Sequence, residues 1–170
     1  VVGDELWFYY SAYAGEPGLK GDTGLQAGLY ANGAVGLAKL RRDGFASMRA
    51  RFPGATMLTR PLTFQGNHLF VNANTVGSEL SVEVVDLDGT PLDGYTAEDC
   101  VPFAGNSTCA EIRWRNADPG ALAGRPVRLR FRLDRGDIYA FWITPSSTGA
   151  SGGYVAAGGP DFDGPVDRIA

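Results

Sequence analysis

The sequence is poor in the residues and patterns that mark several large classes of protein. It has one histidine and two cysteines in 170 residues, too few for a four-ligand zinc site or a cysteine-rich scaffold. No apolar run approaches the roughly 20 residues that a membrane-crossing helix needs. The net charge is −4, without the basic excess typical of nucleic-acid-binding proteins. We therefore expect no zinc centre of this kind, no membrane span and no nucleic-acid partner.

Helical patterning is also absent, whereas signals for strands and turns are frequent. The chain has 24 glycines and 11% aromatic residues, a composition that favours sheets joined by tight turns. The clearest strand is 127–133, in which Leu and Phe alternate with arginine. Further strands are expected at 4–13, 34–40, 55–64, 68–73, 79–86, 111–115 and 138–143. A short Asp-Arg-Gly-Asp turn precedes 138–143, so we expect this strand to form a hairpin with 127–133.

This series of strands predicts an all-β chain, built as an antiparallel β-sandwich of jelly-roll or Greek-key type. Residues 1–45 are expected to form a β-hairpin with a long loop at 14–33, followed by a linker. Residues 46–145 are expected to form the sandwich, and 146–170 a Gly- and Pro-rich tail. A single hairpin is not stable alone in water, so the N-terminal one must pack on something else.

The beginning of the sequence favours a chain that is part of a longer protein. It starts Val1-Val2-Gly3-Asp4, and a strand-like run begins at Leu6 with no basic or apolar leader before it.

The chemically reactive residues do not form a recognisable catalytic set. Cys100 and Cys109 could close a short loop as a disulfide or remain unrelated thiols, because spacing alone does not fix their geometry. His68 has no nucleophile motif beside it and is interpreted as a polar residue at a strand edge. The run Asp86-Leu87-Asp88-Gly89 resembles the opening of a calcium loop but lacks the closing glutamate, so we predict a turn. Calcium is the one cofactor that we keep open, and no catalytic residue is predicted.

Arginines and aromatic residues supply the candidate binding surfaces. Five arginines alternate with apolar residues in two predicted strands: Arg113, Arg115, Arg128, Arg130 and Arg132. They could bind an anionic glycan, but we favour a solvated face in which Glu83 or Glu111 pairs with them across strands. Aromatic rings stack on sugars, and most strand aromatics are expected in the core. Tyr13 and Tyr30 flank the long loop and are therefore the candidate carbohydrate-binding residues.

Several phrases of the sequence resemble a known family. The N-terminal ones are Gly3-Asp4-Glu5-Leu6-Trp7-Phe8-Tyr9-Tyr10-Ser11 and the stretches 23–25, 35–38 and 40–47. The later ones are 59–64, 69–72, 80–84, 124–131 and 139–142. Together they resemble the end of a bacterial five-bladed β-propeller glycoside hydrolase of the fructosidase or arabinanase type, with its last blade hairpin and C-terminal β-sandwich. The phrases are structural, and in such propellers the catalytic carboxylates come from earlier blades.

The resemblance implies a non-catalytic accessory domain of a secreted bacterial glycoside hydrolase. Such a domain would pack on the propeller, stabilise it and assist glycan binding, and the longer protein would carry the catalytic activity. Two alternatives remain open: an independent carbohydrate-binding module and a surface module that binds protein.

Overall fold

The computed structural model describes residues 1–15, 32–75, 77–155 and 158–168. The described residues are β-structure and loops apart from one 3-10 turn, η1 (Pro119–Leu122), which confirms the all-β prediction. The strands are β1 (Glu5–Tyr13), β2 (Gly33–Arg41), β3 (Met48–Ala50), β4 (Ala55–Leu58), β5 (His68–Asn74), β6 (Leu80–Val85), β7 (Cys100–Val101), β8 (Asn106–Trp114), β9 (Arg128–Leu133) and β10 (Gly136–Thr144).

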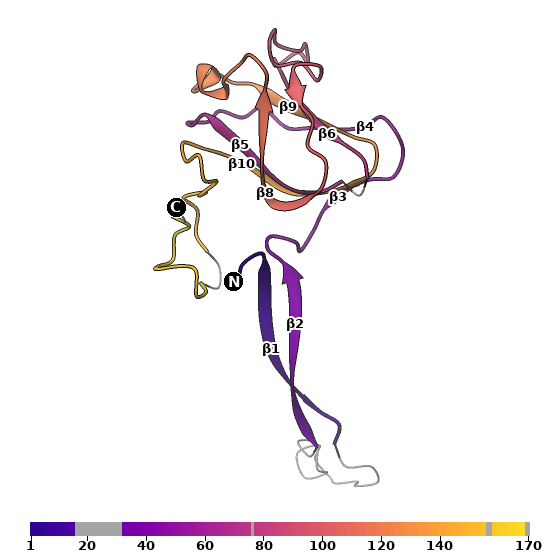
Figure 1. The fold of residues 1–170 in the computed structure, drawn as a ribbon, viewed down its shortest axis with the longest axis vertical. Helices are drawn as coiled ribbons and strands as arrows, with labels where there is room; N and C mark the ends of the chain where they lie inside the picture. Colours follow the sequence, from indigo (N-terminus) through magenta and orange to yellow (C-terminus); the bar gives the residue numbers. More distant parts are fainter. Residues whose placement is uncertain (16–31, 76, 156–157, 169–170) are drawn as a thin grey trace.

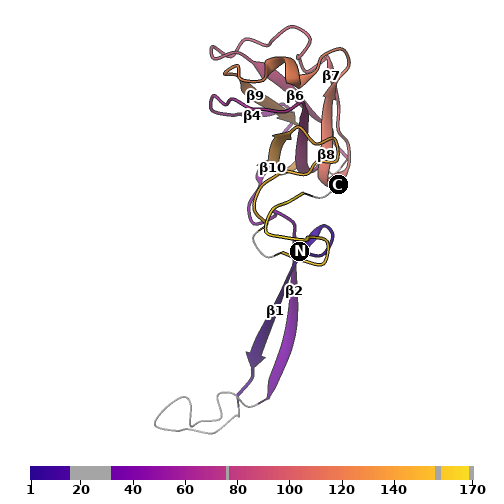
Figure 2. The same ribbon diagram turned by 90° about the vertical axis from the view of Figure 1, so that its left-hand side faces the viewer.

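The strands form three antiparallel sheets (Figure 1). A five-stranded sheet has the order β3-β10-β5-β8-β7, and a three-stranded sheet has the order β4-β9-β6. These two sheets face each other as an antiparallel sandwich, consistent with the predicted architecture. Strands β1 and β2 pair only with each other and project from the sandwich as a long ribbon (Figures 1 and 2).

The sandwich core lies between the two sheets and is built by alternation along the strands. Leu129 and Phe131 of β9 point inward and are 2% and 1% exposed. Leu69 and Val71 of β5 approach from the other sheet and are equally buried. Each strand thus places every second side chain in one apolar layer, as its period of two requires.

The predicted hairpin between β9 and β10 is wrong, because the two strands lie in opposite sheets. Strand β9 pairs with β4 and β6, whereas β10 pairs with β3 and β5. The chain crosses between sheets at Gly136, which has φ +129° and approaches β5 so closely that a Cβ would lie 2.2 Å from the carbonyl oxygen of Asn74. The crossover lets Phe131 of β9 and Phe141 of β10 pack across the core, with ring centroids 5.0 Å apart.

The segment after β10 runs as an extended strap beside the five-stranded sheet and returns to the N-terminus (Figure 1). Its ordered contacts include an isolated bridge between Tyr154 and Val166. The amino group of Val1 donates to the carbonyl oxygen of Gly158 at 2.5 Å. Both ends of the described chain therefore lie at the base of the ribbon.

Candidate functional site

Within the described residues, the ribbon formed by β1 and β2 carries six large exposed apolar side chains: Phe8, Tyr9, Tyr10, Tyr13, Val35 and Leu37. The two strands pair antiparallel over nine residues each, from Glu5 opposite Arg41 to Tyr13 opposite Gly33. Tyr9 is 70% exposed and Val35 is 78% exposed. Large exposed apolar surfaces of this kind mark sites of interaction.

One face of the ribbon carries charged side chains only near its base. The Glu5 carboxylate accepts a hydrogen bond from Trp7 Nε1 at 2.8 Å and lies 3.1 Å from Lys39 Nζ, which sits over the Trp7 ring. These hydrogen bonds, from Trp7 first and then Lys39, lower the pKa of Glu5. Beyond this cluster the same face continues with Tyr9 and its cross-strand partner Leu37, both exposed.

The opposite face carries no charged side chain along the paired residues. Its members, by alternation and register, are Leu6, Phe8, Tyr10, Ala12, Ala34, Gly36, Ala38 and Leu40. The Tyr10 ring lies on Gly36, where an added Cβ would come within 2.3 Å of it. Phe45, from the segment after β2, contacts Phe8 edge-on with ring centroids 6.2 Å apart. This face is therefore apolar from base to tip and only partly covered near its base.

A guanidinium anchors the ribbon to the sandwich. Arg41, the last residue of β2, inserts its side chain against the five-stranded sheet, and its Nε donates to Asn72 Oδ1 at 2.6 Å. Its remaining partners are the Asn106 amide oxygen, the carbonyl oxygens of Ala73 and Ser107, and the ring of Tyr139. One side chain thus joins β2 to β5, β8 and β10.

We call these contacts of the Arg41 side chain the arginine joint. Further contacts beside it also fix the base of the ribbon. Asn72, 1% exposed, donates its Nδ2 to the carbonyl oxygen of Arg42 at 2.7 Å. The Arg42 guanidinium lies 3.1 Å from the buried carboxylate of Asp167 in the strap. Asp4, just before β1, accepts a hydrogen bond from Thr108 of β8. The base of the ribbon is therefore fixed to the sandwich and the strap on both sides.

The roles of Arg41 and Asn72 were not predicted, because the residues between the strand expected at 34–40 and position 45 were interpreted as a linker. A usable signal was present at position 72, where an asparagine interrupts the apolar run of β5. A buried amide must find hydrogen-bond partners, so its position called for a polar side chain from another element.

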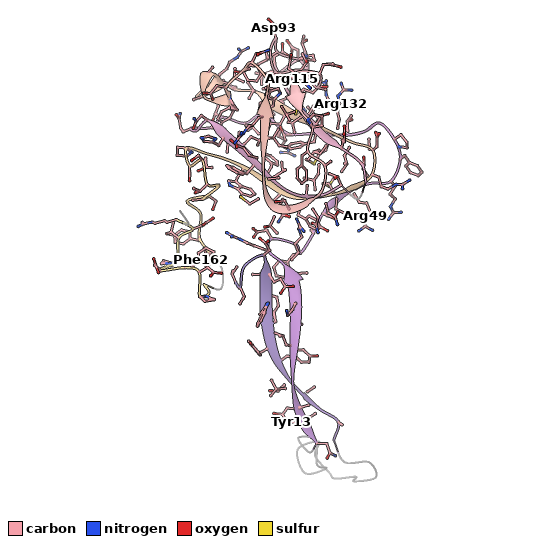
Figure 3. The ribbon with its side chains drawn as sticks, in the orientation of Figure 1. Tyr13, Arg49, Asp93, Arg115, Arg132 and Phe162 are labelled. Carbon is pink, nitrogen blue, oxygen red and sulfur yellow. The ribbon has the colours of Figure 1, made fainter. Side chains whose placement is uncertain are left out.

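Of the two candidate carbohydrate-binding tyrosines, Tyr13 lies among the described residues. Tyr13 ends β1, is 49% exposed and lies against Gly33. Figure 3 shows it at the far end of the ribbon. Tyr30 falls outside the described residues.

The two cysteines are free thiols, so the disulfide alternative does not describe this structure. Cys100 is buried under β6, with its Sγ accepting from the Val82 N–H at 3.4 Å, and burial raises its pKa. In the sheet Cys100 lies opposite Trp114. Cys109 is five residues away along β8, roughly 16 Å at strand spacing, well beyond the reach of a disulfide.

His68 and the arginines mainly make contacts within the sheets. His68 begins β5, and its Nδ1 lies 2.6 Å from Glu111 Oε1. Burial alone would raise the pKa of Glu111, but hydrogen bonds from Arg113 and His68 outweigh it and lower that pKa. Arg115 donates to the carbonyl oxygen of Glu98. His68, Glu111 and Arg113 lie in the five-stranded sheet, and Arg115 directly follows its strand β8.

The other three alternating arginines lie on the outer face of the three-stranded sheet. Glu83, 1% exposed, pairs with Arg130 directly opposite at 2.8 Å and also with Arg132. Arg128 donates to the carbonyl oxygen of Thr59 at 2.8 Å. The expected cross-strand pairing with Glu83 is confirmed, although the five arginines are divided between two faces.

The Asp86 turn is confirmed. Asp86 Oδ1 accepts hydrogen bonds from the backbone N–H groups of Asp88 and Thr90. Across the described ranges, no group of three or more His, Cys, Asp and Glu side chains is arranged to hold a metal ion. No helix in those ranges is long and apolar enough to span a membrane.

Comparison with known proteins gives no relative: no family model, no curated protein and no solved structure matches the chain.

Proposed function

We propose that this chain is a non-catalytic accessory β-sandwich that holds the β1–β2 ribbon in place for a larger β-domain. The domain that best fits the ribbon is a glycoside-hydrolase-like propeller of a secreted bacterial protein, as the sequence resemblance implies. The observation that carries the proposal is the apolar character of both ribbon faces, exposed at Tyr9 and Val35 on one and at Phe8 and Tyr10 on the other.

A ribbon that is apolar on both faces needs a neighbour on each side. A strand pair covering a single core would be polar on its outer face, as β9 is. A propeller blade lies between two neighbouring blades, so both faces of its strands are buried. The ribbon also pairs along one edge of each strand only, and the free edges can accept further strands.

Burial of the ribbon would release substantial free energy. Each large apolar side chain that moves from water into a packed layer contributes about 1.5–3 kcal/mol. Four exposed side chains, Phe8, Tyr9, Tyr10 and Leu37, would together contribute roughly 6–12 kcal/mol on this scale before the costs of association. The arginine joint lowers those costs by fixing the base of the ribbon in advance.

A second candidate function, saccharide stacking, rests on Tyr9 and Tyr13. They lie on the same ribbon face, about 13 Å apart at strand spacing, and both are exposed. Glycan binding by the chain alone that is lost in Tyr9→Ala and Tyr13→Ala would favour this function over docking.

The coding sequence before Val1 provides the sharpest test of the propeller partner. Four repeated blade-like segments with acidic strand ends would support the proposal, and an unrelated upstream domain would overturn it. The purified chain is expected to turn over no aryl-glycoside. Turnover that disappears on substitution of any one of its carboxylates would contradict a non-catalytic role.

A further inference from the structure

A groove on the sandwich is separate from the ribbon and is lined by charged and hydroxyl-bearing side chains. It has a volume of about 800 Å³ and lies where the three-stranded sheet meets the β3–β4, β5–β6 and β9–β10 connections. Its polar lining includes Arg51, Thr56, Ser78, Ser81, Arg132 and Arg135. Arg132, labelled in Figure 3, is on the sandwich, at the opposite end of the molecule from Tyr13.

The floor of the groove is a row of three side chains across the sheet. Thr56 of β4 and Ser81 of β6 are the direct cross-strand partners of Arg132 in β9. All three belong to the outer face, because their neighbours along each strand point into the core. A guanidinium flanked by two hydroxyls is therefore presented on regular strands rather than on loops.

The guanidinium of Arg132 is held in position by the buried carboxylate of Glu83. Arg132 Nε pairs with Glu83, which is 1% exposed, while the Arg132 side chain is 49% exposed. Arg132 contacts Glu83 through Nε, and within the described part of the chain its terminal N–H groups have no other partner and are available to the groove. A buried partner fixes the side chain in advance, which reduces the ordering entropy that a ligand would have to overcome.

The groove contains two further guanidinium groups, those of Arg51 and Arg135. Among the described residues, neither Arg51 nor Arg135 makes a side-chain hydrogen bond or ion pair. By contrast, Arg128 and Arg130 outside the groove lining are engaged with Thr59 and with Glu83 and Gly89. Arg60, Arg125 and Arg168 are likewise without a side-chain partner among the described residues, and what distinguishes Arg51 and Arg135 is that they line the groove together with Arg132.

The groove also contains two carboxylates, and their presence narrows the ligand chemistry. Glu79 and Asp134 line it, and one oxygen of Asp134 accepts the Gly54 N–H at 2.7 Å. A densely charged phosphate chain would be repelled by these groups, whereas a sugar acid supplies hydroxyl donors for them and a carboxylate for the arginines. No aromatic residue belongs to this lining, so a neutral sugar would lack a stacking platform.

We propose that this groove binds an acidic saccharide, with the carboxylate of a uronic acid unit held by Arg51, Arg132 and Arg135 and its hydroxyls by Glu79 and Asp134. This inference is independent of the proposed docking of the ribbon, since the two surfaces share no residue. Either can fail without the other.

The test is isothermal titration calorimetry of the full chain with three probes. These are an oligomer of galacturonic acid, its methyl ester and inorganic phosphate. Binding of the acid with at least tenfold weaker binding of the ester and of phosphate is expected. Equal binding of the ester would show that the carboxylate is not recognised, and equal binding of phosphate would show a general anion site. Either result, or no binding of the acid at millimolar concentration, would overturn the proposal.

A matched pair of double variants places the binding in the groove. Arg51→Gln with Arg135→Gln is expected to weaken binding of the acid at least tenfold. The control, Arg125→Gln with Arg168→Gln, removes the same charge from exposed positions outside the groove and should leave binding within twofold. Equal losses in both would overturn the site, and unchanged thermal unfolding of each variant would exclude misfolding as the cause.

Discussion

The sandwich and the ribbon have the same kind of sequence but opposite surroundings. Along β9, Leu129 and Phe131 are 2% and 1% exposed, whereas along the ribbon Tyr9 and Val35 are 70% and 78% exposed. Both regions alternate, and both are rich in residues that favour strands. The comparison teaches that a period of two predicts a strand but does not predict what covers it.

The largest contrast is expected from truncating one aromatic side chain in each region. Phe131→Ala should lower the free energy of unfolding by about 3–5 kcal/mol, because it opens a cavity in a packed core. Tyr9→Ala should change it by less than about 0.5 kcal/mol, because the ring is exposed. Urea denaturation of both variants measures the difference. Similar losses would show that the ribbon is part of the same cooperative core.

The buried ion pair on the outer face of the sandwich should give the next largest effect. Glu83→Gln leaves Arg130 and Arg132 side by side without their shared carboxylate. We expect a loss of about 2–3 kcal/mol, below the value for a fully buried pair because Arg132 is half exposed. Thermal unfolding measures it, and Glu79→Gln, at an exposed position, is the matched control. Equal shifts of the unfolding temperature in Glu83→Gln and Glu79→Gln would show that the buried ion pair does not stabilise the fold.

The joint between the two regions can be weakened by one substitution at the end of β2, without changing the sandwich. Arg41→Leu removes the hydrogen bonds to Asn72 and Asn106 and leaves the buried Asn72 amide short of a partner. A loss of about 1–3 kcal/mol is expected, together with faster amide hydrogen exchange at the base of β1 and β2. Arg51→Leu, at a residue that makes no hydrogen bond or ion pair with the described residues of the joint, should leave that exchange unchanged. The account of the joint would be falsified if both variants exchanged alike.

The smallest expected effect is a pH dependence within the five-stranded sheet. The pKa of Glu111 is lowered in the folded state, so the unfolded chain binds the proton more readily. The corresponding stability is complete above the ordinary value of 4.5 and is lost as pH falls below it toward the folded pKa. The amount is below about 1 kcal/mol, because Arg113 is largely exposed. In Glu111→Gln, the free energy of unfolding measured by denaturation at several pH values should fall less steeply below pH 4.5 than in the unsubstituted chain. An unchanged dependence on pH would contradict this role of Glu111.

Local features of the sandwich could be predicted from the sequence, whereas contacts between distant segments could not. The strands at β5, β6 and β9 were predicted within a residue or two, because alternation is a local property. The strand predicted at 55–64 ends at Leu58 instead, since Pro61 nearby has no N–H for a ladder. Its continuation at Leu62 makes only an isolated bridge with Val127.

The wrong hairpin and the missed joint share one cause. Whether β10 returns beside β9 or crosses to the other sheet depends on β3 and β5, which lie far away in sequence. In the same way, Arg41 gains its role from Asn72 and Asn106, and no pattern around position 41 encodes them. The lining of the groove likewise comes from segments that are distant in sequence. The spacing of its arginines along the chain therefore could not show that they lie together.

The ribbon is attached to the sandwich at one end only, around Arg41, so a small rotation there moves the far end by a larger distance. Nine paired residues in each strand extend about 30 Å at strand spacing, and the attachment lies at one end. A rotation of about 5° at the joint would displace the tip by about 2.6 Å over that length. Small changes around Arg41 are thus amplified at Tyr13, and a force applied at the tip is transmitted to the sandwich through the contacts at the base of the ribbon.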